Sequence, residues 1–138
     1  MCAILDTNCI GDFKKLKEDM QPVWQWLEKR NGKIVYSDVE KIKTEWDKGG
    51  GYELRRDLIR RDKLKQIPIE DVEERENQLK GKVRSDDEHV IALALTAQVN
   101  VLISSDKALI RDFKKHVTKG KVYKTKQHER LLTKDTCP

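Results

Sequence analysis

The stretch Ala3-Ile4-Leu5-Asp6-Thr7-Asn8 joins a short apolar run of strand length to a carboxylate, a hydroxyl and an amide. In an open sheet of parallel strands, ligands and reacting groups collect beyond the carboxyl ends of the strands. An aspartate at such an end is a candidate ligand or catalyst, and its ordinary alternative is the cap of the next helix. The function of Asp6 therefore depends on which other acids the fold brings to the same edge.

Three further apolar runs have strand character, at 34–36, 101–103 and 121–123, the last as an edge strand. Helical patterns separate them, over 10–20, from Pro22 to about 30, over 37–48, over 85–98 and around 109–113. This alternation predicts an α/β fold, a three-layer α/β/α sandwich around a mostly parallel sheet. Asp106 follows the strand at 101–103, so it meets Asp6 if the two strands run the same way.

The segment 52–82 is polar and is predicted to be mostly helical, with Pro68 dividing it into two helices. Gly49-Gly50-Gly51 precedes it and is expected to be a flexible joint. Its apolar positions are too sparse for a second core. We therefore expect a single domain over 1–138, in which 52–82 is a helical arm or insertion on one edge.

The length and composition limit which classes of protein this chain can belong to. A chain of 138 residues is of single-domain size, and its net charge of +5 favours a polyanionic partner. No apolar run approaches the roughly 20 residues needed to span a bilayer. The three cysteines show no CxxC spacing, which is typical of a reduced cytosolic protein. We expect a cytoplasmic protein with no membrane partner.

Two of the predicted helices begin with the S-x-x-E pattern of a capping box, Ser37 to Glu40 and Ser85 to Glu88. In a capping box the glutamate bonds the backbone at the start of its own helix. Glu40 and Glu88 are therefore expected to be capping partners. Glu40 remains an alternative to Glu45 as the functional acid of its helix.

The apolar faces of these helices select two other acids. Asp87 shares a face with Val90 and Ile91, which turns it toward the sheet, and Glu45 lies one turn from Ile42. The ordinary alternatives are a favourable first-turn charge for Asp87 and a surface carboxylate for Glu45.

Four acids are thus predicted to converge at one edge. Close carboxylates raise one another's pKa values unless a cation neutralises them. Mg²⁺ or Mn²⁺ suits a site of carboxylates and waters, where it activates water and stabilises charge on a phosphoryl group. In a net-basic protein such a site favours a phosphodiester substrate. The predicted metal-binding and catalytic residues are Asp6, Glu45, Asp87 and Asp106.

These motifs carry a resemblance to a known family. The stretch 3–8 resembles the opening of PIN-domain ribonucleases, and 87–94 followed by 102–106 resembles the second half of that family. The segment 38–46 is similar to the family's middle segment, which bears a helical glutamate. Ser104-Ser105-Asp106 stands where Thr-x-Asp is common, which preserves the hydroxyl.

The resemblance implies a three-layer endoribonuclease that uses Mg²⁺ or Mn²⁺ to hydrolyse single-stranded or structured RNA. It implies the same four acids as metal ligands, with Asn8 and Ser104 orienting their carboxylates. Many bacterial members are toxins inhibited by a small antitoxin and many dimerise, so an antitoxin partner and a homodimer are implied as well.

Basic residues supply candidate RNA contacts. In the arm these are Arg55, Arg56, Arg60 and Arg61, and their alternative is a solvated helix with Asp57 and Asp62 as local partners. A second basic region follows the last predicted long helix. It comprises Lys114, Lys115, Lys119, Lys121, Lys124 and Lys126.

Two other functions stay open. One is a non-catalytic RNA-binding or regulatory module with this fold, which loss of one of the four acids would indicate, and none is missing. The other is an aspartyl-phosphate phosphatase, but Asn8 stands where a second aspartate would be expected. The three histidines lack zinc-ligand spacing and are expected to be structural or surface groups.

Overall fold

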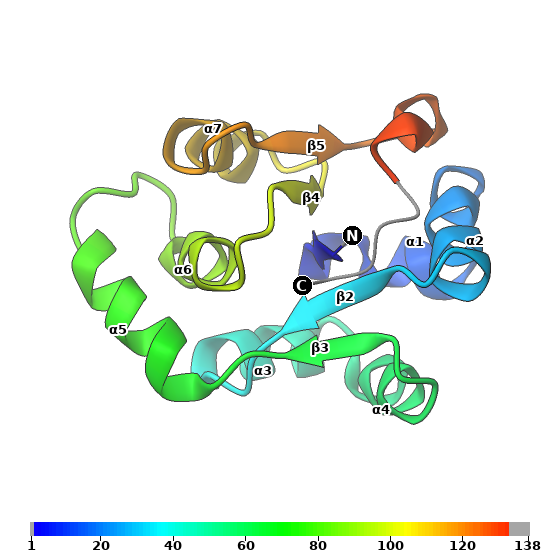
Figure 1. Cartoon of the computed structure of the whole chain (residues 1–138), viewed down its shortest axis with the longest axis horizontal. Helices are drawn as coiled ribbons and strands as arrows, with labels where there is room; N and C mark the ends of the chain where they lie inside the picture. Colours follow the sequence, from blue (N-terminus) through cyan, green and yellow to red (C-terminus); the bar gives the residue numbers. More distant parts are fainter. Residues whose placement is uncertain (1, 133–138) are drawn as a thin grey trace.

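The computed structural model describes residues 2–132, which form a five-stranded sheet in the order β3-β2-β1-β4-β5 with all neighbouring strands parallel. Helices cover the sheet on both faces, which makes a three-layer α/β/α sandwich (Figure 1). The predicted fold class is confirmed. The strands are β1 (Cys2–Leu5), β2 (Lys33–Tyr36), β3 (Leu64–Gln66), β4 (Val101–Ile103) and β5 (Lys121–Tyr123).

β1 is the central strand, and its pairing places the edge at which Asp6 lies. Leu5 is paired with Ile103 of β4, while Ala3 is paired with Ile34 of β2. β1 and β4 are buried along their whole lengths, as strands covered on both faces must be. Because the strands are parallel, the residues that follow them leave the sheet at one edge.

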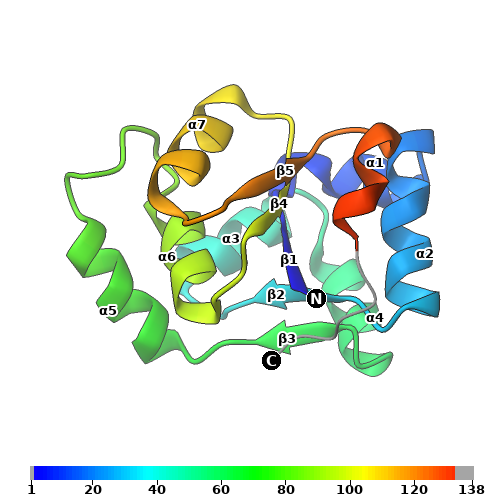
Figure 2. The ribbon, with the colours of Figure 1, turned by 45° about the horizontal axis from the view of Figure 1, so that its top comes forward.

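The arm at 52–82 contributes a strand to the sheet, which the sequence did not predict. Its two predicted helices are present as α4 (Tyr52–Arg60) and α5 (Ile69–Leu79), with Pro68 at the N-cap of α5. Between them β3 pairs with β2 and forms an edge of the sheet (Figure 2). Leu64 is the one apolar residue of β3, so this strand depends on its partner β2 more than on its own composition.

The helix predicted over 10–20 is interrupted. A 3-10 turn, η1 (Thr7–Cys9), leads into α1 (Ile10–Lys14), and a second turn, η2 (Glu18–Met20), precedes α2 (Gln21–Lys29). Leu16 lies between them with a left-handed φ of 53° and is 47% exposed. The apolar periodicity therefore predicted a helix that runs past the end of α1 at Lys14, whereas Pro22 lies in the first turn of α2 as predicted.

Neither predicted capping box forms. α3 (Glu40–Lys48) has Val39 at its N-cap and α6 (Glu88–Ala97) has Asp87, and neither N-cap side chain makes a capping hydrogen bond. Both helices thus begin two residues later than the S-x-x-E pattern predicts. Ser37 is instead fully buried directly after β2. The later start leaves Asp87 just outside its helix.

α6 is the most apolar helix of the described chain, and α5 packs along it on the outside (Figure 1). α7 (Lys107–His116) and the 3-10 helix η3 (Lys126–Leu131) flank β5, which is an edge strand as predicted. Within residues 2–132, no helix has the length and apolar character that crossing a bilayer requires.

The cysteines depart from the expectation of a fully reduced set. Cys2 is disulfide-bonded, whereas Cys9 is free and buried. Burial raises the pKa of the Cys9 thiol to about 11, so it is not a thiolate at neutral pH. Cys137 lies outside the described residues.

The triglycine segment forms a packed turn rather than the expected flexible joint. The Gly51 N–H donates to the Trp46 carbonyl at 2.7 Å, and Gly50 has a φ of +80°. A Cβ on Gly51 would lie 2.9 Å from a methyl carbon of Ile10 and 2.9 Å from the Trp46 ring and carbonyl. The turn therefore presses the C-terminal end of α3 against α1.

We predict that Gly51→Ala lowers the free energy of unfolding by about 1–3 kcal/mol, because the added methyl overpacks this contact. Gly11→Ala is the matched control, since a Cβ at Gly11, inside α1, meets nothing within 4 Å. The control should be neutral or stabilising by up to about 1 kcal/mol. Urea unfolding of both variants measures the difference, and equal effects would contradict the packed turn.

Candidate functional site

Asp6 lies at the carboxyl end of β1, where backbone and side-chain contacts hold it. Its N–H donates to the Ile103 carbonyl at 2.9 Å, which extends the pairing of β1 with β4 by one residue. Its Oδ2 accepts the Ser104 hydroxyl at 2.7 Å, and its Oδ1 accepts the Asn8 N–H at 3.4 Å. With 8% of its surface exposed, Asp6 is a buried carboxylate held in one orientation.

Ser104 joins Asp6 to Asp106. Besides donating to Asp6, the Ser104 Oγ accepts the Asp106 N–H at 3.0 Å. Asp106 is the N-cap of α7, and its Oδ1 accepts the N–H groups of Ala108 and Leu109 at 3.0 and 3.3 Å. The capping role considered for Asp106 is therefore present, and it fixes the carboxylate beside Ser104.

Asp87 and Glu45 reach the same edge from two helices. Asp87 is half-buried at the N-cap of α6, and Glu45 extends from the middle of α3. Glu45 and Asp6 both line a small cavity of about 20 Å³, which is room for roughly one water. Glu40 is exposed at the first position of α3, so the structure favours Glu45 over Glu40 as the helical acid of this edge.

The pKa values show that the four acids act on one another. Burial raises the pKa of Asp6, and the charges of Asp106 and Glu45 add to the rise, against hydrogen bonds from Ser104 and Asn8. Burial likewise raises the pKa of Asp87 against the charge of His89 and a hydrogen bond from Ser85, and the charges of Asp106 and Asp6 add to the rise. The structure therefore brings all four predicted acids within electrostatic reach.

The four carboxylates do not converge tightly. In the part of the chain that the structure describes, no group of three or more His, Cys, Asp or Glu side chains is placed to hold a metal ion. Their chemistry fits a hard divalent cation, because carboxylate oxygens are the donors that Mg²⁺ and Mn²⁺ prefer. Among the described residues, none of the four forms an ion pair with a lysine or arginine.

Of the two predicted supports, Ser104 contacts an acid through its side chain and Asn8 does not. The Asn8 side chain is exposed, and its contribution to Asp6 is the backbone N–H. Any residue with an N–H can make that bond in this turn. The asparagine side chain at position 8 is therefore not needed to hold Asp6 in place.

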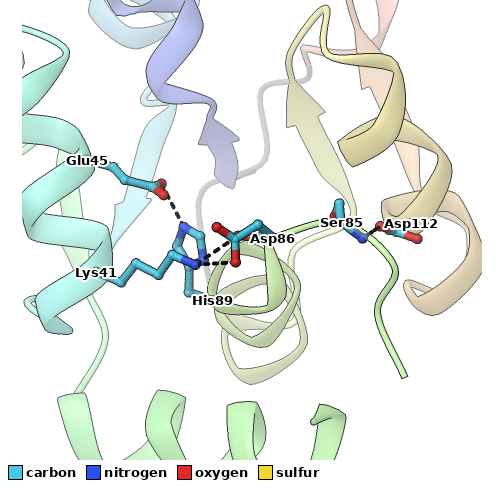
Figure 3. Close-up of polar contacts among 6 residues, drawn as sticks. All are labelled: Lys41, Glu45, Ser85, Asp86, His89 and Asp112. Atoms are coloured by element: carbon cyan, nitrogen blue, oxygen red, sulfur yellow. Dashed lines mark hydrogen bonds and ion pairs between the residues drawn. The ribbon is translucent and has the colours of Figure 1, made fainter. Parts of the chain in front are cut away.

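Two contacts that the sequence did not predict join α3 to the start of α6 (Figure 3). The His89 Nε2 lies 2.7 Å from the Glu45 Oε2, and the Lys41 Nζ donates to the Asp86 Oδ1 at 2.8 Å and to its carbonyl at 3.0 Å. The partners are 44 and 45 residues apart in sequence. No local spacing could therefore have indicated these pairs.

Asp112 anchors the loop that carries Asp87. It is buried on α7, and its Oδ2 accepts the Ser85 N–H at 2.8 Å (Figure 3). Burial by itself raises the pKa of Asp112, but hydrogen bonds from Ser85 and the Arg84 backbone outweigh it and hold the pKa below its usual range. The loop before α6 is thus fastened to α7 as well as to α3.

Arg55 is not on a basic surface. It is 6% exposed, its Nη1 donates to the Asp47 Oδ1 at 2.9 Å, and its guanidinium lies over the rings of Tyr36 and Tyr52, at 5.2 and 5.4 Å. A buried, ion-paired arginine between two aromatic rings stabilises packing. It is not available to contact a phosphate.

The other three arginines of the arm are more exposed. Arg60 pairs with Asp57 at 3.4 Å and remains 74% exposed, while Arg61 pairs with Asp57 and Glu28, both at 3.3 Å. Arg56 is exposed beside the Tyr52 ring. The local ion pairing considered for this helix is thus present at Arg60 and Arg61. Among the described residues Arg56 forms no ion pair, so it is the arginine of this set most available for a phosphate.

We predict that Asp6→Asn raises the unfolding temperature at pH 7. The pKa of Asp6 is higher in the folded protein than its value of 3.8 in the unfolded chain. Raising the pH from 3.8 through the pKa of the folded protein therefore lowers the stability of the wild type. Asparagine removes this charge, and its one amide oxygen still accepts either the Ser104 hydroxyl or the capping Asn8 N–H. Calorimetry at several pH values should show the gain above this interval and none below about pH 4.

Asp62→Asn is the control, since the Asp62 side chain is 90% exposed and pairs with Lys33 at 3.6 Å. Asparagine suits the left-handed φ of 55° at Asp62, so any gain in this variant should be the same at every pH. A lower unfolding temperature for Asp6→Asn at pH 7 would contradict the account of Asp6 as a carboxylate that its surroundings destabilise.

Comparison with known proteins adds no family to this site. A scan against protein-family models, a search of curated proteins and a search of solved structures each found no match for this chain.

Proposed function

We propose that this protein is a metal-dependent endoribonuclease that hydrolyses RNA phosphodiester bonds. The observation that carries the proposal is a buried aspartate after the central strand, in electrostatic reach of three further acids. The residues that would hold Mg²⁺ or Mn²⁺ are Asp6, Glu45, Asp87 and Asp106. Such an ion supplies water activation and charge stabilisation at a phosphoryl group.

The electrostatics of the edge support a cation there. The raised pKa values of Asp6 and Asp87 mean that negative charge at these positions is costly in the folded protein. A divalent ion would remove that cost. Ser104 and the first amides of α7 already fix Asp6 and Asp106, so two of the four ligands need no ordering when the ion binds.

A polyanionic substrate is supported by the charge of the chain. The net charge is +5 although the edge itself is acidic, so basic residues dominate elsewhere. RNA, rather than another phosphodiester, is supported by the resemblance of 3–8, 87–94 and 102–106 to PIN-domain ribonucleases. Exposed lysines that could follow a phosphate backbone are Lys114, Lys115, Lys119, Lys121 and Lys124.

The same resemblance extends the proposal to partners. We include in it a role as the toxin of a toxin–antitoxin pair, with an antitoxin protein as inhibitor and a homodimer as the working form, and copurification with a small partner and sedimentation of the purified chain test these parts directly. The proposal also includes a cytoplasmic location, which rests on the absence of CxxC spacing among the three cysteines.

A second candidate is a non-catalytic RNA-binding module with this fold. It is favoured by the arrangement of the acids, because among the described residues no three of them are placed to hold a metal as they lie. This candidate binds RNA and leaves it intact. It differs from the nuclease in every cleavage assay.

We predict that the purified protein cleaves single-stranded RNA with Mn²⁺ or Mg²⁺, and that Asp6→Asn and EDTA each abolish cleavage. Mn²⁺ should also raise the unfolding temperature of the wild type and not that of Asp6→Asn, because the ion binds the folded site. Gel assays and calorimetry measure both effects. Cleavage that persists in EDTA would refute the metal mechanism, and RNA binding without cleavage would establish the second candidate.

Glu45→Gln and Glu40→Gln are a matched pair of variants on α3, and they test which glutamate is the metal-binding acid. Glu45 lines the cavity beside Asp6 and Glu40 is exposed, so only Glu45→Gln should reduce cleavage, by about 10- to 100-fold or more. The opposite result would transfer the role to Glu40.

A further inference from the structure

His89 is a fully buried polar side chain near the acidic edge. It is the second residue of α6 and is 1% exposed, although its neighbours Asp87 and Glu88 are partly accessible. Its ring lines the same small cavity as Asp6 and Glu45. The position is therefore inside the fold and directly beside the acids.

The ring has one hydrogen bond, and its geometry identifies the donor. The Nε2 lies 2.7 Å from the Glu45 Oε2, and a carboxylate oxygen accepts only, so Nε2 carries the hydrogen. The Nδ1 is buried without a hydrogen-bond partner among the described residues. An apolar side chain would fill this space without stranding a polar atom, so the contact to Glu45 is what the histidine adds.

Glu45 depends on this contact for its orientation. Its side chain is one-third exposed, and within residues 2–132 the hydrogen bond from His89 is the one that its carboxylate accepts. The charges of Asp6 and Glu45 repel: burial is the main cause of the raised pKa of Asp6, and the Glu45 charge adds to the rise. Without the His89 donor, repulsion and hydration both favour a rotamer that turns Glu45 into solvent.

The pairing of the two helices has a second support. Lys41, one turn before Glu45 on α3, is bonded to Asp86 just before α6 (Figure 3). This contact ties the same two segments at their surface. Loss of the His89 bond therefore frees the Glu45 side chain while the Lys41 contact still holds α3 beside α6.

We propose that His89 is a positioning residue whose Nε2–H holds the Glu45 carboxylate at the small cavity that Asp6 also lines. The inference rests on the proposed function, because it assigns Glu45 to a cation site. Hydrogen bonds to carboxylate ligands fix their orientation, and loss of such partners commonly weakens metal binding 10- to 100-fold.

The test uses two isosteric amides. The amide nitrogen of glutamine reaches the position of a histidine Nε2, whereas that of asparagine reaches only the position of Nδ1. His89→Gln should keep Mn²⁺ affinity within about threefold of the wild type, and His89→Asn should weaken it about 10- to 100-fold, both measured by titration calorimetry. Crystal structures should show the Glu45 carboxylate at this cavity in His89→Gln and in solvent in His89→Asn.

His116 is the matched control, because it also has a buried ring nitrogen without a partner but lies at the opposite end of α7 from Asp106. His116→Asn should leave Mn²⁺ affinity unchanged. Equal loss in both His89 variants would show that the ring serves packing and would overturn the proposal, as would wild-type affinity in folded His89→Asn. If the wild type itself binds no Mn²⁺, the proposed function fails first.

Discussion

The parallel pairing of β1 with β4 is the constraint on which the rest of the site depends. Leu5 and Ile103 are neighbours in that pairing, so the residues that follow them emerge side by side. The Asp6 N–H continues the ladder to the Ile103 carbonyl, and the Ser104 hydroxyl then reaches the Asp6 carboxylate. Two segments 98 residues apart thereby become one small polar cluster at the end of an apolar sheet.

That cluster carries an electrostatic cost, and within residues 2–132 no lysine or arginine forms an ion pair with its acids. Burial and neighbouring carboxylates raise the pKa values of Asp6 and Asp87, while Arg55, the buried arginine, is used elsewhere. The edge is stabilised by neutral donors instead, chiefly the Ser104 hydroxyl and backbone amides. Neutral donors orient carboxylates without supplying positive charge, and this uncompensated charge is the basis of our proposal that the site binds a cation.

The helices complete the site because the loops before them are fastened. Asp112 holds the backbone before α6 to α7, and the Lys41 contact holds the same loop to α3. These bonds join segments that are remote in sequence, so the position of Asp87 depends on how α3, α6 and α7 pack together. The packed triglycine turn does the same for α3, since Gly51 lies against Ile10 and Trp46.

The arginines of the arm show that residue type alone does not predict which charged side chains are exposed. Arg55 and Arg56 are adjacent in sequence, yet one is buried between two tyrosine rings and the other is exposed. The 3.6-residue period of α4 separates them onto different faces. Which face becomes the interior depends on β2 and β3, and not on the arginines themselves.

Local sequence determined the elements whose signal is strong over a few residues. The apolar runs specified β1, β2, β4 and β5, and the aspartates directly after two of them specified the edge, because strand composition and chain direction suffice for that. Tertiary structure alone decided β3, the late start of α3 and α6, and the bond from His89 to Glu45. Each of these depends on a partner tens of residues away, and the energy of such a contact appears only when both segments are packed together.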